Sequence, residues 1–302
     1  MESKTISRFN AFLMFILILF WGSSFVVVKV ALMEGLTPIA IATFRFLVAG
    51  GLFLVAILLE GMRVKGYVFF VEKKDFPMLV LLALTGVTFF FTAQYTGIKM
   101  AGASIAAIFV CLLAPVFITV LSAKLLKEHL VKRQFLGVGI AAIGTFIVIM
   151  GGSISLQTNH QFLLGSLILL STPILWTAYS LLGKNVMEKY SPFLVVAYVN
   201  ILGGLLLIPF SLADGSFSQI FTMHLNGWLA ILFLAVTCSF LGYYIWFYVI
   251  KRVGAAIASS FLFAEPLITA LFAVAFVREE LNLFTVAGGF LIFIGVYLVT
   301  RK

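Results

Sequence analysis

Charged side chains are scarce in this sequence. Asp, Glu, Lys and Arg together make up 10% of its 302 residues, whereas they account for roughly 25% of a typical soluble domain. Hydrophobic residues make up 63% of the chain and are gathered into segments of about twenty, the length that a helix needs to cross a bilayer. Nearly every residue lies in such a segment or in a short connection, which leaves no space for a soluble catalytic domain.

Groups that enzymes and metal sites need are also few. The two cysteines, Cys111 and Cys238, lie within apolar segments. The three histidines, His129, His160 and His224, lie in the connections between such segments. This spacing supports neither a disulfide framework nor a zinc site, and no P-loop pattern for ATP occurs. We therefore expect a protein without enzyme activity, cofactor or metal, in which the cysteines are small packing residues.

Ten apolar segments predict an all-α integral membrane protein with ten transmembrane helices. They cover residues 11–32, 38–59, 77–97, 103–123, 134–152, 162–182, 193–213, 227–249, 255–276 and 284–300. The first segment is longer than the apolar part of a signal peptide and lacks a cleavage pattern, so we expect it to remain as a helix.

The positions of Lys and Arg predict how the chain is oriented in the membrane. With the N-terminus in the cytoplasm, sixteen of these twenty residues fall in segments on the cytoplasmic side. Lys29, Lys99 and Arg278 fall on the opposite side, and Arg45 lies inside a span. Cytoplasmic loops typically carry such an excess. We therefore predict a multi-pass protein of the cytoplasmic membrane with both termini in the cytoplasm, and we attribute the net charge of +9 to topology rather than to nucleic-acid binding.

The second half of the chain repeats the first. At a constant offset of 151, the residues of one half align with those of the other: Pro115, Lys127–Glu128, Leu130, Gly137 and Gly144 with Pro266, Arg278–Glu279, Leu281, Gly288 and Gly295. We predict two five-helix repeats, 1–152 and 153–302, which together form one transport domain. Because five is odd, the second repeat enters the membrane inverted, a plan that recurs in secondary transporters with the substrate near the midplane.

Three features together resemble the EamA family of the drug/metabolite transporter (DMT) superfamily. They are the 5+5 plan, the Trp21–Gly22–Ser23–Ser24 start, and two segments that run from an intramembrane proline to a glutamate at a helix end. These segments are 114–130 and 265–281. The resemblance implies an exporter-like carrier with a central cavity, and it places the helices predicted at 134–152 and 284–300 at the periphery. It does not identify the substrate.

Glu265 is the most unusual polar residue within a predicted span. It lies near the centre of 255–276 and is followed by Pro266. A charge at the bilayer midplane costs about 2.5 kcal/mol or more, and the proline removes a backbone donor, which should free the carbonyl of Leu262 and kink the helix. We predict that Glu265 lies beside a cavity, where it couples proton movement to transport or pairs with a cationic part of the substrate. The alternative is a protonated or hydrogen-bonded structural glutamate at the kink. Pro115 is the matching kink in the first half, but Ala114 precedes it.

Hydroxyl, amide and aromatic side chains share single faces of several predicted helices. Such side chains suit a cavity for an amphipathic solute, and the alternative is packing between helices. The candidate cavity residues, besides Glu265, are Trp21, Ser24, Arg45, Gln94, Tyr95, Trp176, Tyr179, Ser180, Tyr243 and Trp246. Arg45 is predicted to bind a carboxylate or to pair with Glu34.

These features together predict a secondary transporter, and more specifically an exporter. It would move a small organic metabolite, such as an amino acid or an amphipathic compound, by alternating access, with the lipid bilayer and protons as its other partners. The alternative is a channel, or a lipid-scrambling or scaffold protein of the membrane. A channel is expected to have rings of charge or a carbonyl filter, and a single buried acid makes a poor ring.

Overall fold

The computed structural model describes residues 6–63, 70–101, 106, 108–128, 130–151, 160–277 and 283–300, which form helices and connections without any β-strand. Arg278, Glu279 and Leu281, which belong to the predicted repeat, lie outside these ranges. In chain order the α-helices are α1 (Arg8–Met33), α2 (Pro38–Arg63), α3 (Phe76–Ala83), α4 (Phe89–Ala101), α6 (Ala114–Leu125), α7 (Lys132–Gly151), α8 (His160–Val186), α9 (Pro192–Ala213), α10 (Leu225–Phe233), α11 (Gly242–Val253), α12 (Ala255–Ser260), α13 (Glu265–Val277) and α14 (Leu283–Thr300).

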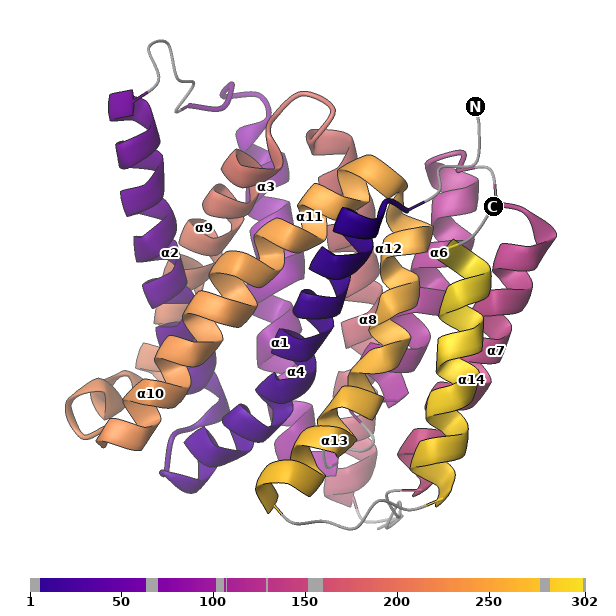
Figure 1. The fold of residues 1–302 in the computed structure, drawn as a ribbon. Helices are drawn as coiled ribbons and strands as arrows, with labels where there is room; N and C mark the ends of the chain where they lie inside the picture. Colours follow the sequence, from indigo (N-terminus) through magenta and orange to yellow (C-terminus); the bar gives the residue numbers. More distant parts are fainter. Residues whose placement is uncertain are drawn as a thin grey trace.

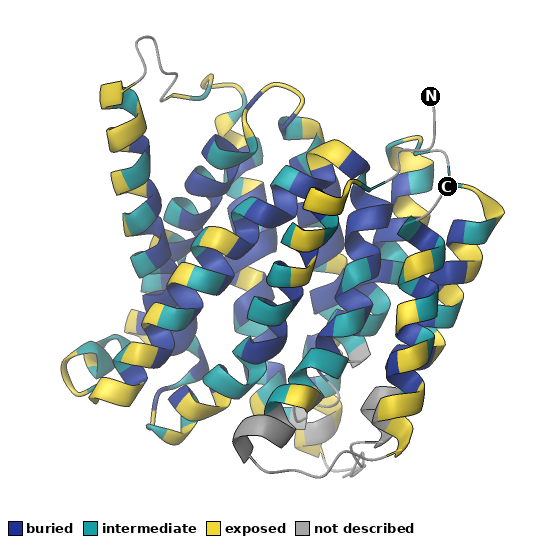
Figure 2. Ribbon diagram, in the orientation of Figure 1, coloured by how far each residue is buried: buried dark blue, intermediate teal, exposed yellow. Residues whose placement is uncertain are grey.

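The helices form a bundle whose outer surface is apolar. Within the described part of the chain, six helical stretches are long and apolar enough to cross a membrane, and three shorter apolar helices accompany them. Large hydrophobic side chains such as Leu136, Ile143 and Phe293 are exposed, and exposed positions follow the outer faces of the helices (Figure 2). A soluble protein would not leave so much contiguous apolar surface in water. The predicted all-α membrane protein is confirmed at this level.

Hydrogen bonds between connections identify the two ends of the bundle. At one end, the Tyr190 hydroxyl in the α8–α9 connection donates to Asp75, just before α3, at 2.6 Å. At the other end, the backbone N–H of Thr37 in the α1–α2 connection donates to Gln219 at 3.0 Å. We call these the Asp75 end and the Gln219 end. α1 begins and α14 ends at the Asp75 end (Figure 1).

Irregular turns interrupt several of the helices. A π-helical turn, η1 (Leu84–Thr88), joins α3 to α4, and a longer one, η4 (Leu234–Leu241), joins α10 to α11. A π-helical turn, η2 (Ile108–Leu113), also precedes α6, and a 3₁₀ turn, η5 (Phe261–Ala264), lies between α12 and α13. Such turns inside helices are frequent at functional sites.

The two prolines lie at helix starts, immediately after these turns. Pro115 is the second residue of α6 and Pro266 the second residue of α13. The expectation that the carbonyl of Leu262 is freed is wrong, because it accepts the backbone N–H of Glu265. The 3₁₀ turn supplies a donor one residue before the proline, so the carbonyl of Leu262 keeps a hydrogen-bond partner.

Helices α7 and α14 pack against each other at one edge of the bundle (Figure 1). Their backbones approach closely at paired glycines, where a Cβ added to Gly295 would lie 2.5 Å from the carbonyl oxygen of Gly137 and from the backbone nitrogen of Ala141. Small residues permit such approach between membrane helices. The repeat therefore places glycines where the terminal helices of the two halves meet.

Gly295→Ala is expected to destabilise the protein by about 1–3 kcal/mol, the usual cost of overpacking a tight interface. The two nearest atoms belong to the backbone and the third is the Cβ of Ala141, so none of them can rotate aside. Gly139→Ala is the matched control, because a Cβ at this exposed position of α7 meets nothing within 4 Å. Thermal unfolding of both variants in detergent checks this, and equal midpoints would contradict the packing described.

Candidate functional site

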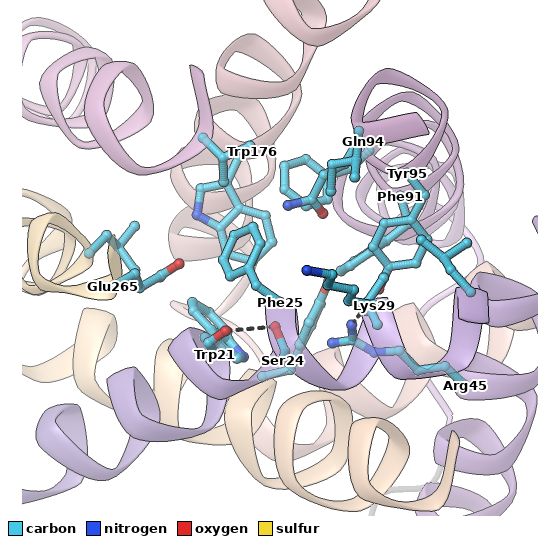
Figure 3. A pocket seen from close by; sticks show the side chains of 17 residues that line it. Trp21, Ser24, Phe25, Lys29, Arg45, Phe91, Gln94, Tyr95, Trp176 and Glu265 are labelled. Atoms are coloured by element: carbon cyan, nitrogen blue, oxygen red, sulfur yellow. Dashed lines mark hydrogen bonds between the residues drawn. The ribbon is translucent and has the colours of Figure 1, made fainter. Parts of the chain in front are cut away.

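A cavity of about 320 Å³ lies between helices from both halves of the chain (Figure 3). Its volume falls in the range of pockets that hold small molecules, roughly 300–1,000 Å³. Its lining comes from α1, α2, α4, η2, α8, α11, η5 and α13, and from neither α7 nor α14 among the described residues. The cavity is thus central, and the helices predicted to be peripheral do not reach it.

Eight of the eleven candidate cavity residues line this pocket. They are Trp21, Ser24, Arg45, Gln94, Tyr95, Trp176, Tyr243 and Glu265. The structure adds apolar and aromatic neighbours that were not proposed as site residues, among them Phe90 and Val110, and a second cation, Lys29. Lys29 directs its amino group into the pocket (Figure 3).

The other three candidates, Tyr179, Ser180 and Trp246, do not line the pocket. All three are buried, and the Trp246 ring lies 5.8 Å from that of Trp176, beneath the lining. Tyr179 packs at 4.7 Å between ring centroids on Phe247. The prediction that these three line the cavity is wrong, because spacing along α8 and α11 gives the direction of a side chain but not which neighbour covers it. Their place corresponds to the packing alternative.

Aromatic rings form the inner wall of the pocket. The centroids of Trp21 and Trp176 are 5.4 Å apart with the rings nearly perpendicular, and Trp21 and Tyr243 are 6.2 Å apart in the same arrangement. Edge-to-face pairs of this kind stabilise by about 0.5–1.5 kcal/mol beyond the area that they bury. The Trp21 indole also donates to the Cys238 carbonyl at 3.0 Å, which fixes its orientation against η4.

Arg45 is held by neutral groups. Its Nε donates to the Ser239 hydroxyl at 2.7 Å, and one terminal nitrogen donates to the Tyr95 hydroxyl at 3.0 Å. The expected alternative, a pair between Arg45 and Glu34, is wrong. Glu34 lies in the α1–α2 connection and accepts a hydrogen bond from Asn226.

Glu265 is buried beside the pocket, with 5% of its surface exposed. The Cys111 thiol lies 3.5 Å from one carboxylate oxygen, and no cation in the described part of the chain forms an ion pair with it. Sequence reasoning treated Cys111 as a packing residue. The signal that could have found this contact is the position of Cys111 one turn before Pro115, in the segment that the repeat pairs with that of Glu265.

The pocket reaches the Gln219 end of the bundle. Leu32 in the last turn of α1 and Ile98 in the last turn of α4 belong to its lining. Lys29, in the same part of α1, is exposed. The opening is therefore on the side opposite the Asp75 end.

At the Asp75 end, Glu128 lies in the connection that follows α6. The two oxygens of its carboxylate accept the backbone N–H groups of Ala255 and Ala256 at 2.9 and 3.2 Å, and Lys184 at the end of α8 forms an ion pair with it. The carboxylate also lies 2.9 Å from where a Cβ of Gly254 would be, and Gly254 has a φ of +95°. Only glycine suits both the backbone angle and the space. Glu128 thus caps α12 and ties α6, α8 and α12 together.

A second cluster at the same end is partly exposed to solvent. Lys189 and Tyr190 both donate to Asp75 at 2.6 Å. These hydrogen bonds hold the pKa of Asp75 below its usual value. The cluster connects the segment before α3 to the α8–α9 connection.

No group of His, Cys, Asp or Glu side chains that could hold a metal ion occurs within the described ranges. Within the described part of the chain, apolar helices surround a central pocket whose lining extends to the Gln219 end, an arrangement that suits a membrane transporter. Residues 8–150 and 163–301 each match the EamA-like transporter family, and the chain therefore belongs to this family. The family resemblance predicted from the sequence is confirmed.

Several relatives cover nearly the whole chain. An "Uncharacterized transporter" of Archaeoglobus fulgidus is 31% identical over 94% of this chain and 95% of its own. A "Probable amino-acid metabolite efflux pump" of Salmonella typhimurium is 28% identical over 97% of this chain and 95% of its own. A solved crystal structure with 18% identity has a TM-score of 0.77 and covers 97% of this chain and 98% of its own, which shows a shared fold.

Proposed function

We propose that this protein is a secondary transporter that exports a small organic metabolite across the cytoplasmic membrane by alternating access. The observation that carries the proposal is a pocket between the two halves that reaches the Gln219 end, while Glu128 ties the helices together at the other end. A solute in this pocket meets water on one side only. A conformational change that closes the open end and opens the closed end would carry the solute across the membrane.

The proposed topology is ten spans in two inverted five-helix repeats. The match of residues 8–150 and 163–301 to one family supports the duplication. The irregular turns support it too, because π-helical turns η1 and η4 occupy similar places in the two halves and η2 and η5 each precede one of the paired prolines. Two similar halves in opposite orientation give inward-open and outward-open states of similar energy.

The proposed sidedness puts the Asp75 end in the cytoplasm. Basic residues gather there, at the end of α6 (Lys124), the start of α7 (Lys132), the end of α8 (Lys184) and the end of α11 (Lys251). Their excess is expected on the cytoplasmic side. In this orientation the pocket is open to the outside, and both termini are cytoplasmic.

The proposed substrate is an amino acid or a similar amphipathic metabolite. The pocket combines aromatic walls with a few polar groups, Gln94, Tyr95 and Ser24, which suits a solute with one apolar and one polar part. The name of the Salmonella typhimurium relative points in the same direction. Glu265 is proposed to couple this movement to protons.

Counterflow in proteoliposomes tests the transport proposal. Vesicles loaded with an unlabelled amino-acid mixture are expected to take up a labelled amino acid transiently and with saturation, because a carrier exposes one site alternately to each side. Protein-free vesicles are the control. Unsaturated flux without counterflow would instead indicate a channel, and translocation of labelled lipid without solute uptake would indicate a scramblase.

A further inference from the structure

Arg45 is a buried cation without a counter-charge of its own. It lies in α2, has 3% of its surface exposed and belongs to the pocket lining. Within the part of the chain that the structure describes, none of the ion pairs involves it. Its guanidinium lies over the rings of Phe91 and Phe46, with its carbon 4.6 and 5.1 Å from their centroids. Burial of a charge is unfavourable unless the charge is paired.

The hydrogen bonds of Arg45 leave part of its guanidinium unused. The group has five N–H donors in a planar fork, and the Ser239 and Tyr95 hydroxyls accept two of them. No protein acceptor among the described residues takes the others. Since the side chain lines the pocket, these donors are available to a solute inside it. Figure 3 shows the guanidinium beside Tyr95 at the side of the pocket opposite Glu265.

We infer that Arg45 binds the carboxylate of the transported solute. A guanidinium fork matches the two oxygens of a carboxylate, and such bonds are among the strongest in proteins. A doubly charged phosphate would call for several converging cations. Here the immediate neighbours of Arg45 are neutral hydroxyls and aromatic rings, and Lys29 is the one further cation on the described lining of the pocket.

The rest of the solute would contact a lining that is largely apolar. Phe25, Phe90 and Trp176 lie on the pocket lining together with Arg45, so a carboxylate at Arg45 leaves the remainder of the molecule among aromatic rings. The inferred substrate class is a small monocarboxylic acid with an apolar or aromatic body, either with or without an amino group. This inference rests on the proposed transport function and adds the chemical class of its substrate.

Binding of matched probe pairs to the full-length protein tests the inference. The pairs are 3-phenylpropionate with 3-phenylpropanol, and L-phenylalanine with L-phenylalaninol, which differ only in the carboxylate. Quenching of tryptophan fluorescence reports binding, because Trp21 and Trp176 line the pocket. At least one carboxylate is expected to bind about tenfold or more tightly than its alcohol. The pair that shows this difference tells whether the substrate is a simple carboxylic acid or an amino acid.

Variants of Arg45 assign the difference to this residue. Arg45→Gln should bring the affinity ratio of carboxylate to alcohol close to one, and Arg45→Lys should keep part of it, because an ammonium retains the charge but not the fork. Arg252→Gln is the matched control, since Arg252 is exposed and stacks on Tyr248 away from the pocket. If the Arg45 variants do not fold, Lys29→Gln decides, because Lys29 is the other cation on the described lining: a carboxylate preference that survives this change supports Arg45, and one that is lost overturns the inference.

Three results would overturn the inference: no carboxylate binds, the alcohols bind as tightly as the acids, or Arg45→Gln keeps the ratio. Failure of the transport proposal is a separate result. Carboxylate binding that holds without counterflow would remove the transport function and leave the binding site. Counterflow of a neutral solute, together with an unchanged affinity ratio of carboxylate to alcohol in Arg45→Gln, would keep the transport function and remove the carboxylate site at Arg45.

Discussion

Glu265→Gln is expected to abolish accumulation of substrate driven by a pH gradient. For one proton per solute, a gradient of one pH unit sustains about a tenfold solute gradient, since each 1.36 kcal/mol corresponds to a factor of ten. Glu265 is buried beside the pocket with a thiol as its hydrogen-bonding neighbour. Glutamine keeps the shape of the side chain but cannot release a proton. The accumulation ratio in the variant should therefore fall to one, and any remaining counterflow should no longer vary with pH.

The measurement is uptake into proteoliposomes with and without an imposed pH gradient. Glu188→Gln is the matched control, because Glu188 is an exposed acid in the α8–α9 connection, and this variant should respond to the gradient like the unaltered protein. If Glu265→Gln still accumulates substrate in response to the gradient, the coupling role is removed. Glu265 would then be the structural glutamate that the sequence left as the alternative.

The sequence predicts the main features of the site because they depend on local properties. An acid within an apolar segment must be sheltered from lipid, and this is enough to expect Glu265 beside a cavity. Hydroxyl and aromatic residues on one helix face predict a lining, and Trp21, Tyr95 and Trp176 lie on it. Each of these predictions uses a single helix.

Predictions that depend on two helices are less successful. Tyr179 and Trp246 share faces with lining residues but are covered by neighbouring rings. Glu34 was the expected partner of Arg45, whereas its hydrogen-bond partners are Tyr95 in α4 and Ser239 in η4. The contact between Cys111 and Glu265 joins segments more than a hundred residues apart. Such contacts follow from how the helices pack, and the spacing within one helix does not specify that.

Helix geometry near the prolines shows the same limit. Proline removes a donor, so the sequence predicts a broken hydrogen bond at Leu262. It does not predict that η5 tightens into a 3₁₀ turn and satisfies that carbonyl from Glu265. The sequence therefore points to an irregularity near Pro266, where η5 lies, but not to the bonding within it.

Glu128→Ala is expected to open the closed end of the bundle. The carboxylate, 13% exposed, accepts two backbone N–H groups of α12 and pairs with Lys184. Hydrogen bonds to a charged group contribute about 1.5–3 kcal/mol each, and 1.4 kcal/mol changes a population tenfold. Removing the carboxylate should therefore raise the population open at the Asp75 end by about tenfold or more, because only the state closed at this end loses these bonds.

A cysteine at Ser180 reports this opening. Ser180 is fully buried in α8, one turn before Lys184, so a membrane-impermeant thiol reagent should reach it only when the Asp75 end opens. In a background with Cys111 and Cys238 replaced by serine, Glu128→Ala should raise the labelling rate of Ser180→Cys by about tenfold or more in inside-out vesicles.

Lys184→Met provides the graded control for the same experiment. It removes the ion pair but leaves the two backbone hydrogen bonds to Glu128, so its labelling rate should lie between those of the unaltered chain and Glu128→Ala. Equal rates in all three proteins would show that Glu128 does not hold this end closed. If both variants instead show the same rise in labelling rate and a lower thermal stability, Glu128 is needed for folding rather than for gating. A gate residue changes the balance of two folded states and leaves both intact.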